Sequence, residues 1–240
     1  AEQANKIHSI IAKAVTENRV KSKRLLLVGV GPGSSEYLTD IAKDVIRKSK
    51  YLIGYKYTLS IVRDLIIPHF HQVYEVTMKD QDETYNEVHK KMGENEFCTI
   101  PFTGDVNFSE SEVVDRLLEI FGNDNVELMP GISSIQVAAA KAKIPLDKAI
   151  ILSFHVTENI EDKKRELVKA IQEKKSVILV PRPWNNNVEK NFMQSEIALY
   201  LKKEGVNTSN LIVWVFEFLS TADERVFKGR LKKKKKMDFS

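Results

Sequence analysis

Short apolar runs alternate with amphipathic stretches along most of this 240-residue chain. Runs with the length and composition of buried strands occupy residues 24–30, 50–54, 72–77, 97–102 and 125–129. Between them, apolar residues recur at the three- and four-residue spacings of helices that are buried on one face. These helical stretches cover residues 35–48, 58–67, 82–93 and 110–121. Strands that alternate with helices favour a parallel sheet with helical crossovers.

A second block of the same kind follows residue 130. It begins with a helix rich in small residues at 132–143, after the pattern-breaking pair Pro130-Gly131. Further strands are predicted at 149–154, 176–181, 210–218 and 224–231, with helices at 160–174 and 188–203. The pattern therefore predicts an α/β fold with two α/β lobes, at residues 24–130 and 131–231.

Both ends of the chain differ from the lobes. In residues 1–23, apolar positions recur on one helical face, which predicts a helical extension. The net charge of +4 arises at the other end, because six of the 37 basic residues lie within residues 230–236. The remaining 31 basic residues face 33 acidic ones, a net charge of −2. We interpret residues 232–240 as a solvated basic tail and expect no nucleic-acid partner. A tail that binds nucleic acid in a salt-dependent manner is the alternative.

Apolar runs and cysteine content set further limits. No run approaches the roughly 18 apolar residues of a membrane span. The N-terminal residues also lack the apolar centre of a secretory signal. We therefore expect a cytoplasmic protein without membrane contact. Cys98 is the only cysteine, which excludes an intrachain disulfide, and its apolar surroundings predict a buried thiol.

Three loops that join a strand to a helix carry the candidate chemistry. The first, at residues 28–33, reads VGVGPG. It fits a dinucleotide fingerprint poorly, because Ser34 stands where the third glycine belongs and no acidic residue follows about 20 positions on. This argues against a nicotinamide oxidoreductase. A tight turn without a ligand is the alternative for this loop.

The second loop, at residues 101–109, reads PFTGDVNFS, and the third, at residues 129–136, reads MPGISSIQ. In open α/β sheets, ligands bind at the carboxyl edge, where such loops lie. Asp105 fits either a turn residue or a ligand-binding carboxylate. Ser133 and Ser134 offer two hydroxyls at a helix start, where one suffices as the cap. Ser109 and Glu112 fit a capping box for the helix between these loops.

Together, in this order and spacing, the segments resemble the tetrapyrrole methylases, which use S-adenosylmethionine, over residues 24–231. The resemblance rests on GVGPG at 29–33, LTDIA at 38–42, YLIG at 51–54, GD at 104–105, PGISS at 130–134 and DERV at 223–226. Within the family, residues 133–140 and 153–155 look most like the methyltransferases of corrin carbon 5. Those enzymes act on precorrin-6Y or cobalt-precorrin-7 in cobalamin biosynthesis.

The resemblance implies a cofactor cleft between the two lobes, S-adenosylmethionine as cofactor, a corrinoid substrate and a homodimer. The residues implied to bind the cofactor are Pro32, Thr103, Gly104, Asp105, Phe108, Ser133, Ser134, Val180 and Pro181. Those assigned to the substrate are Gly31, Gly33, Lys56 and Arg182. The chain departs from the family where the second loop continues after Gly104-Asp105, because the usual small residues are replaced by VNFSE. This puts the affinity for the cofactor in question.

Methyl transfer to a ring carbon also requires a group that removes a proton. Tyr55, Lys79 and His155 are candidates because each follows a strand end. His69 and His71 have the spacing of metal ligands, but no third ligand stands near them, so we expect no metal site. The functional alternatives are a sibling methylase acting on uroporphyrinogen, another corrin carbon or diphthine, and a degenerate corrinoid-binding protein without activity.

Overall fold

A computed structural model describes residues 23–108, 110–155, 159–182 and 193–231. The predicted N-terminal extension and basic tail lie outside the described residues. The chain divides into two compact units, residues 1–133 and 134–240, and each is described by itself. Within the described residues, no helix is long and apolar enough to cross a membrane.

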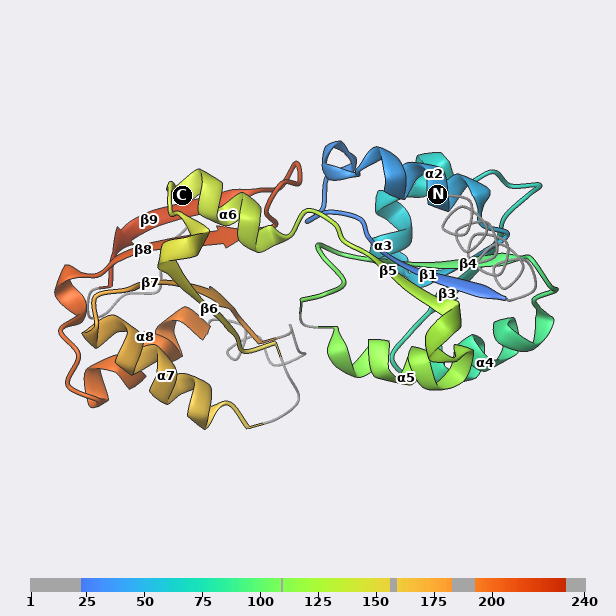
Figure 1. Ribbon diagram of the computed structural model, residues 1–240. Helices are drawn as coiled ribbons and strands as arrows, with labels where there is room; N and C mark the ends of the chain where they lie inside the picture. The colour runs from blue at the N-terminus through green and yellow to red at the C-terminus, as the bar shows by residue number, and fades with distance from the viewer. Residues whose placement is uncertain (1–22, 109, 156–158, 183–192, 232–240) are drawn as a thin grey trace, which may run out of the picture. The chain divides into compact units, whose positions relative to one another are not determined.

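The first unit is built on a five-stranded sheet in the order β3-β2-β4-β1-β5 (Figure 1). Every pair of neighbouring strands is parallel. This confirms the predicted parallel α/β sheet. The strands are β1 (Arg24–Gly29), β2 (Tyr51–Tyr55), β3 (Gln72–Val76), β4 (Phe97–Phe102) and β5 (Val126–Met129).

Helices cover both faces of this sheet (Figure 1). One face packs against α2 (Asp40–Lys48), α3 (Lys56–Ile61) and the short helix η2 (Arg63–Leu65). The other packs against α4 (Gln81–Lys91) and α5 (Ser111–Phe121), and η3 (Asn123–Asn125) precedes β5. Because β1 has helices on both sides, Leu25, Leu27 and Val28 are fully buried. Cys98 of β4 is also fully buried, as predicted.

The helix predicted over residues 35–48 is divided in two. A single turn, η1 (Ser35–Tyr37), comes first, and α2 begins only at Asp40. The division arises because two hydroxyl side chains each cap a turn. Ser34 Oγ accepts from the Glu36 N–H at 3.2 Å, and Thr39 Oγ1 accepts from the Ala42 N–H at 3.2 Å. Residues such as these compete with the helical backbone for hydrogen bonds, and periodicity alone does not reveal that.

The second unit holds two small sheets. Strands β6 (Ala149–Ser153) and β7 (Ser176–Val180) are parallel, whereas β8 (Ile212–Glu217) and β9 (Arg225–Arg230) are antiparallel. Its apolar core joins β6, β7 and β8 to the helices α7 (Glu161–Gln172) and α8 (Met193–Lys203). The helices are α6 (Ser134–Ala142), η4 (Leu146–Lys148), α7 (Glu161–Gln172), α8 (Met193–Lys203) and η6 (Thr208–Asn210). Residues 188–192 of the predicted helix at 188–203 lie outside the described residues.

His71 is a buried structural residue of the first unit. The Ile67 N–H donates to its Nδ1 at 2.7 Å, and its Nε2 donates to the Ile46 carbonyl at 2.9 Å. Both ring nitrogens are therefore used by the backbone, which leaves no lone pair for a metal. Within the described residues, no group of three His, Cys, Asp or Glu side chains is placed to hold a metal ion.

We expect His71→Ala to lower the free energy of unfolding markedly. Each buried backbone group that loses its partner costs roughly 1–3 kcal/mol. Urea unfolding followed by circular dichroism measures this loss. His69→Ala is the matched control, because His69 is exposed in the same segment. Equal stability of the two variants would contradict the structural role of His71.

Candidate functional site

The carboxyl edge of the five-stranded sheet gathers the loops that carry the sequence motifs. All five strands are parallel, so the segments after them emerge at one edge. The neighbouring strands β1 and β4 send their loops to opposite faces, toward α2 and α5 respectively. In open α/β sheets, ligands bind at the point where neighbouring loops diverge in this way. We refer to this point, at the carboxyl ends of β1 and β4, as the crevice.

Three glycine loops meet at this point through their backbones. Gly31 and Gly104 form a two-way bridge, with N···O distances of 3.3 and 2.7 Å. A Cβ atom on Gly29 would lie 2.5 Å from the Gly131 nitrogen and 2.7 Å from the Gly104 carbonyl oxygen. A Cβ atom on Gly131 would lie 2.6 Å from the Gly29 carbonyl oxygen. Side chains other than hydrogen are excluded here, so the loops after β1, β4 and β5 are held together as one assembly.

The loop after β4 forms a tight turn around Asp105. Its Oδ1 accepts from the Asn107 N–H at 2.8 Å and from the Asn107 side-chain amide at 3.0 Å. The Phe108 N–H donates to the Asp105 carbonyl at 3.1 Å. Val106 is 1% exposed and packs into the core beneath α5. The bulk that replaces the family's small residues at Val106 is therefore absorbed by the core.

The expected cofactor residues of this unit differ in exposure. Pro32 is buried, Thr103 is exposed, and Phe108 is half-buried. Ser133 and Ser134 are both half-buried, and α6 begins at Ser134. Ser109 lies outside the described residues, so the predicted capping box does as well. The roles of the expected residues in cofactor binding stay predictions.

The loops after β2 and β3 bring further polar groups to the same edge. Lys56 begins α3 and Lys79 precedes α4, and both side chains are exposed. The Lys79 N–H donates to Thr77 Oγ1 at 3.2 Å, within the turn that leads to α4. Two neighbouring strands are therefore each followed by one exposed lysine on the carboxyl side of the sheet.

Tyr55, at the end of β2, donates its hydroxyl to Gln81 Oε1 at 2.7 Å. Gln81 is buried at the start of α4 and also accepts from the Tyr85 hydroxyl at 3.4 Å. Burial raises the pKa of Tyr55, and the negative charge of Glu110 raises it further. A hydroxyl that already donates its proton and ionises only at high pH is a poor base near neutral pH.

Sequence reasoning missed Glu110, which lies directly before α5. Its side chain is half-buried, and burial raises the pKa of its carboxyl from 4.5 to about 7. No local pattern marks this residue, because it reads as an ordinary acidic residue at a helix start. Its shifted pKa depends on side chains that the fold brings around it.

In the second unit, the expected site residues lie at the carboxyl ends of β6 and β7. The Phe154 N–H donates to the Val180 carbonyl at 2.8 Å, which extends the pairing of these strands. Burial lowers the pKa of His155, and a hydrogen bond to the Pro181 carbonyl partly opposes this shift. His155 is therefore neutral at neutral pH. Lys163, which the sequence did not single out, donates to the Ser153 carbonyl at 2.9 Å.

Arg182 follows β7 and pairs with Glu196 of α8. The Arg182 Nε atom is buried without a hydrogen-bond partner among the described residues. Lys164 of α7 also approaches Glu196, at 3.4 Å. The charge of Arg182 is thus partly neutralised within the protein, which weakens it as a partner for a substrate carboxylate.

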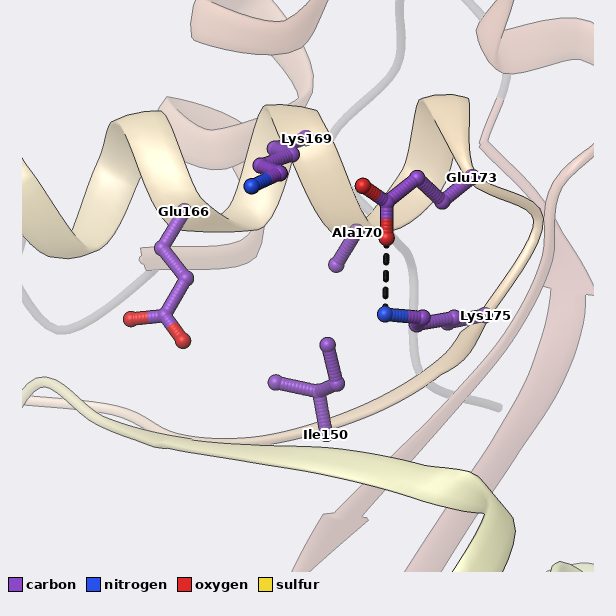
Figure 2. Close-up of a pocket in the computed structure, with 6 residues that line it drawn as sticks. All are labelled: Ile150, Glu166, Lys169, Ala170, Glu173 and Lys175. Atoms are coloured by element: carbon purple, nitrogen blue, oxygen red, sulfur yellow. Dashed lines mark ion pairs between the residues drawn. The ribbon is translucent and has the colours of Figure 1, made fainter.

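A shallow pocket of about 240 Å³ lies elsewhere in this unit, against α7 (Figure 2). Its lining residues are Ile150, Glu166, Lys169, Ala170, Glu173 and Lys175. The two that Figure 2 joins by a dashed line, Glu173 and Lys175, form an ion pair of 2.7 Å. Ile150 lies near the start of β6 and Lys175 directly before β7. The pocket is therefore at the amino ends of the strands, opposite the edge where such sheets bind ligands.

Comparison with known proteins identifies relatives over the part of the chain that contains the three loops. The profile described as Tetrapyrrole (Corrin/Porphyrin) Methylases matches residues 24–235. A protein of Methanocaldococcus jannaschii, named as a probable cobalt-precorrin-7 C(5)-methyltransferase, is 29% identical over 219 residues. That match covers 90% of this chain and 93% of the relative.

Solved structures share the fold. The methyltransferase CobJ superposes with a TM-score of 0.69 at 16% identity, over 88% of this chain and 87% of its own. A uroporphyrin-III C-methyl transferase from Thermus thermophilus was solved in complex with S-adenosylhomocysteine. It superposes with a TM-score of 0.61 at 20% identity, over 87% of this chain and 83% of its own.

We expect Gly131→Ala to destabilise the protein, because the added methyl group would clash with backbone atoms of two other loops. Overpacking of this kind costs about 1–3 kcal/mol. Thermal unfolding measures the effect. Gly93→Ala is the control, since a Cβ there meets only the Glu96 side chain at ordinary contact distance, 3.4 Å. A Gly131→Ala protein as stable as this control would contradict the close approach of the loops.

Glu110 also predicts a pH dependence of stability. Its pKa is higher in the folded protein than the ordinary 4.5, so the folded state binds more protons between pH 4.5 and about 7. The contribution of Glu110 to stability therefore falls as the pH rises through this window. Relative to the wild type, Glu110→Gln should gain stability over the same window and differ by a constant amount above it. Urea unfolding at a series of pH values tests this, and a pH-independent difference would contradict it.

Proposed function

The chain belongs to the tetrapyrrole (corrin/porphyrin) methylases, and from this premise we propose that it methylates carbon 5 of a corrin-ring intermediate, cobalt-precorrin-7 or precorrin-6Y, in cobalamin biosynthesis. The observation that carries the proposal is the meeting of three glycine loops where β1 and β4 diverge. The family profile spans all three loops.

The residues at the crevice fit S-adenosylmethionine. That cofactor supplies an activated methyl group on a positively charged sulfonium. The glycine loops are buried against one another at Gly29, Gly31 and Gly104, whereas Thr103 and Phe108 offer a hydroxyl and an aromatic face that remain partly open. Asp105 holds the turn of the second loop through its Oδ1, and Glu110 places an acidic group at the same edge. We propose that Gly104, Asp105 and the residues beside them hold the cofactor, with Pro32, Ser133 and Ser134 completing its surroundings.

A corrinoid intermediate carries many carboxylates, so its binding requires cations outside the acidic part of the site. Lys56 and Lys79 are exposed at the same sheet edge and fit this role. Gly31 and Gly33, in the loop after β1, would allow the flat ring to approach the backbone. Arg182 is a weaker candidate because Glu196 already pairs with it. We also propose a homodimer, as the resemblance implies.

The choice of carbon 5 rests on the Methanocaldococcus jannaschii relative and on the resemblance at residues 133–140 and 153–155. Sibling enzymes that methylate other tetrapyrroles share the fold, which makes them the second candidate function. A direct assay separates them. Purified protein is incubated with labelled S-adenosylmethionine and, in parallel, with cobalt-precorrin-7, precorrin-6Y or uroporphyrinogen III. Label in either corrinoid supports the proposal, whereas label in uroporphyrinogen III alone would overturn it.

We expect calorimetry to detect saturable binding of S-adenosylmethionine and S-adenosylhomocysteine, and we expect Asp105→Ala to weaken it about tenfold, or about 1.4 kcal/mol. The reason is loss of the turn that Asp105 Oδ1 holds. Asp105→Asn keeps an oxygen at this position and should bind nearly as well as the wild type.

Asp124→Ala serves as the control for these variants, because Asp124 is exposed in η3 at the opposite edge of the sheet. Equal weakening by Asp105→Asn and Asp105→Ala would mean that the carboxylate charge itself contacts the ligand. Well-folded wild-type protein that binds neither compound would contradict the methyltransferase proposal.

A further inference from the structure

Two neighbouring segments at the carboxyl edge of the five-stranded sheet each expose one large apolar side chain. Tyr57 follows β2 and is 50% exposed, and Met78 follows β3 and is 77% exposed. These parallel strands end together, because Tyr55 and Val76 are their last paired residues. Tyr57 and Met78 therefore each stand two residues past the last pair. Single apolar residues scattered over a surface need no explanation, whereas two that leave paired strands at equivalent positions call for one.

The turn that carries Met78 is held at both of its ends by Tyr55. The backbone pairing of β2 with β3 ends at Tyr55, and the Tyr55 hydroxyl donates to Gln81 Oε1, beyond the turn, at 2.7 Å. Within the turn, Asp80 Oδ1 accepts from the N–H and the hydroxyl of Thr77, at 2.6 and 3.0 Å. The polar groups of the turn are thus used inside it, and the Met78 side chain is left in solvent on a fixed backbone.

Tyr57 lies in the first turn of α3, which also rests on Tyr55. Thr58 Oγ1 donates to the Tyr55 carbonyl at 2.9 Å, and Ser60 Oγ donates to the Tyr57 carbonyl at 2.6 Å. Thr58 and Leu59 are buried against the unit, whereas Tyr57 faces solvent. The backbone that carries the Tyr57 ring is therefore fixed by groups other than the ring itself.

Two cations accompany the apolar side chains. Lys56 directly precedes Tyr57, Lys79 directly follows Met78, and both lysines are exposed. Among the residues that the structure describes, none forms an ion pair with either ammonium group. Asp80, beside Lys79, already accepts two hydrogen bonds within the turn. The surface therefore combines apolar area with positive charge that its described neighbours do not compensate.

Resting on the proposed function, we propose that Tyr57 and Met78 form a platform for one face of the substrate ring, with Lys56 and Lys79 pairing with the carboxylates at its rim. A corrin-type ring presents a broad apolar face, and its acidic side chains extend outward from the edge. An aromatic ring and a thioether both pack well against such a face. Lysine attracts a carboxylate as a point charge that requires no fixed geometry. The platform contributes to the affinity for the substrate and takes no part in methyl transfer itself.

Binding of cobyrinic acid, a stable corrin with carboxylate side chains, tests the platform without methyl transfer. In titrations followed by visible absorbance, Tyr57→Ser and Met78→Ser should each weaken binding about tenfold, because each removes one packed side chain. Tyr57→Phe and Met78→Leu keep the apolar area and should bind nearly as well as the wild type. Phe70→Ser is the matched control, because Phe70 is 46% exposed and lies just before β3, at the opposite end of that strand.

Salt dependence separates the platform from the two cations. Lys56→Gln and Lys79→Gln should weaken binding at low salt and flatten its dependence on salt, because ions screen exposed charges. Tyr57→Ser and Met78→Ser should keep the salt dependence of the wild type. Lys90→Gln is the control for the lysine variants, because Lys90 is exposed in the last turn of α4.

Kinetics complete the test. With cobalt-precorrin-7, Tyr57→Ser and Met78→Ser should raise KM about tenfold and change kcat little, as expected for an interaction that ground state and transition state share. Calorimetry should show that both variants bind S-adenosylhomocysteine as the wild type does.

Serine variants that bind cobyrinic acid as tightly as the wild type would overturn the platform, and so would equal weakening by Phe70→Ser. If the surface instead joins two copies of the chain, the serine variants would sediment as monomers and bind the corrin unchanged, which also overturns it. Wild-type protein that binds S-adenosylhomocysteine but no corrin would overturn the proposed function itself.

Discussion

The contact among Gly29, Gly104 and Gly131 is the constraint on which the site depends. The strands β4, β1 and β5 are adjacent in the sheet. The loop that follows each of them therefore lies beside the loop of the neighbouring strand. A Cβ atom at Gly29 or Gly131 would collide with backbone of the other loops. The loops contact one another through backbone atoms, so backbone geometry and the Gly31–Gly104 bridge fix their positions. Side chains have little influence on where the loops lie.

This constraint separates two kinds of group at the sheet edge. The glycine loops contact one another through their backbones, and a side chain on Gly29 or Gly131 would collide there. The charged groups come from the flanking elements, where side chains have room. Lys56 and Lys79 follow β2 and β3, and Glu110 precedes α5. The rigid part of the site and the chemically variable part thus come from different elements of the same unit.

The sequence predicted the strands, most helices and the three loops, because periodicity and glycine are local signals. It failed where the answer depends on the fold. The break before Thr39 arises from a hydroxyl that competes for a backbone hydrogen bond. The departure VNFSE put the affinity for the cofactor in question, and only the fold shows that Val106 lies in the core. Glu110 was missed because nothing in its local pattern indicates burial, and the bond from Tyr55 to Gln81 joins residues 26 positions apart.

The division between the glycine loops and the flanking charged side chains explains why a shared fold does not determine which ring carbon is methylated. Under the proposed function, a cofactor held mainly by backbone can be bound by relatives that differ at most positions, since the glycine contact restricts only a few residues. The acceptor and its reactive carbon must be recognised by side chains, and these change without disturbing the loops. At the position where this chain departs from the family pattern, it carries a partly buried carboxyl and keeps the turn at Asp105. We therefore expect this departure to bear on substrate chemistry more than on cofactor affinity.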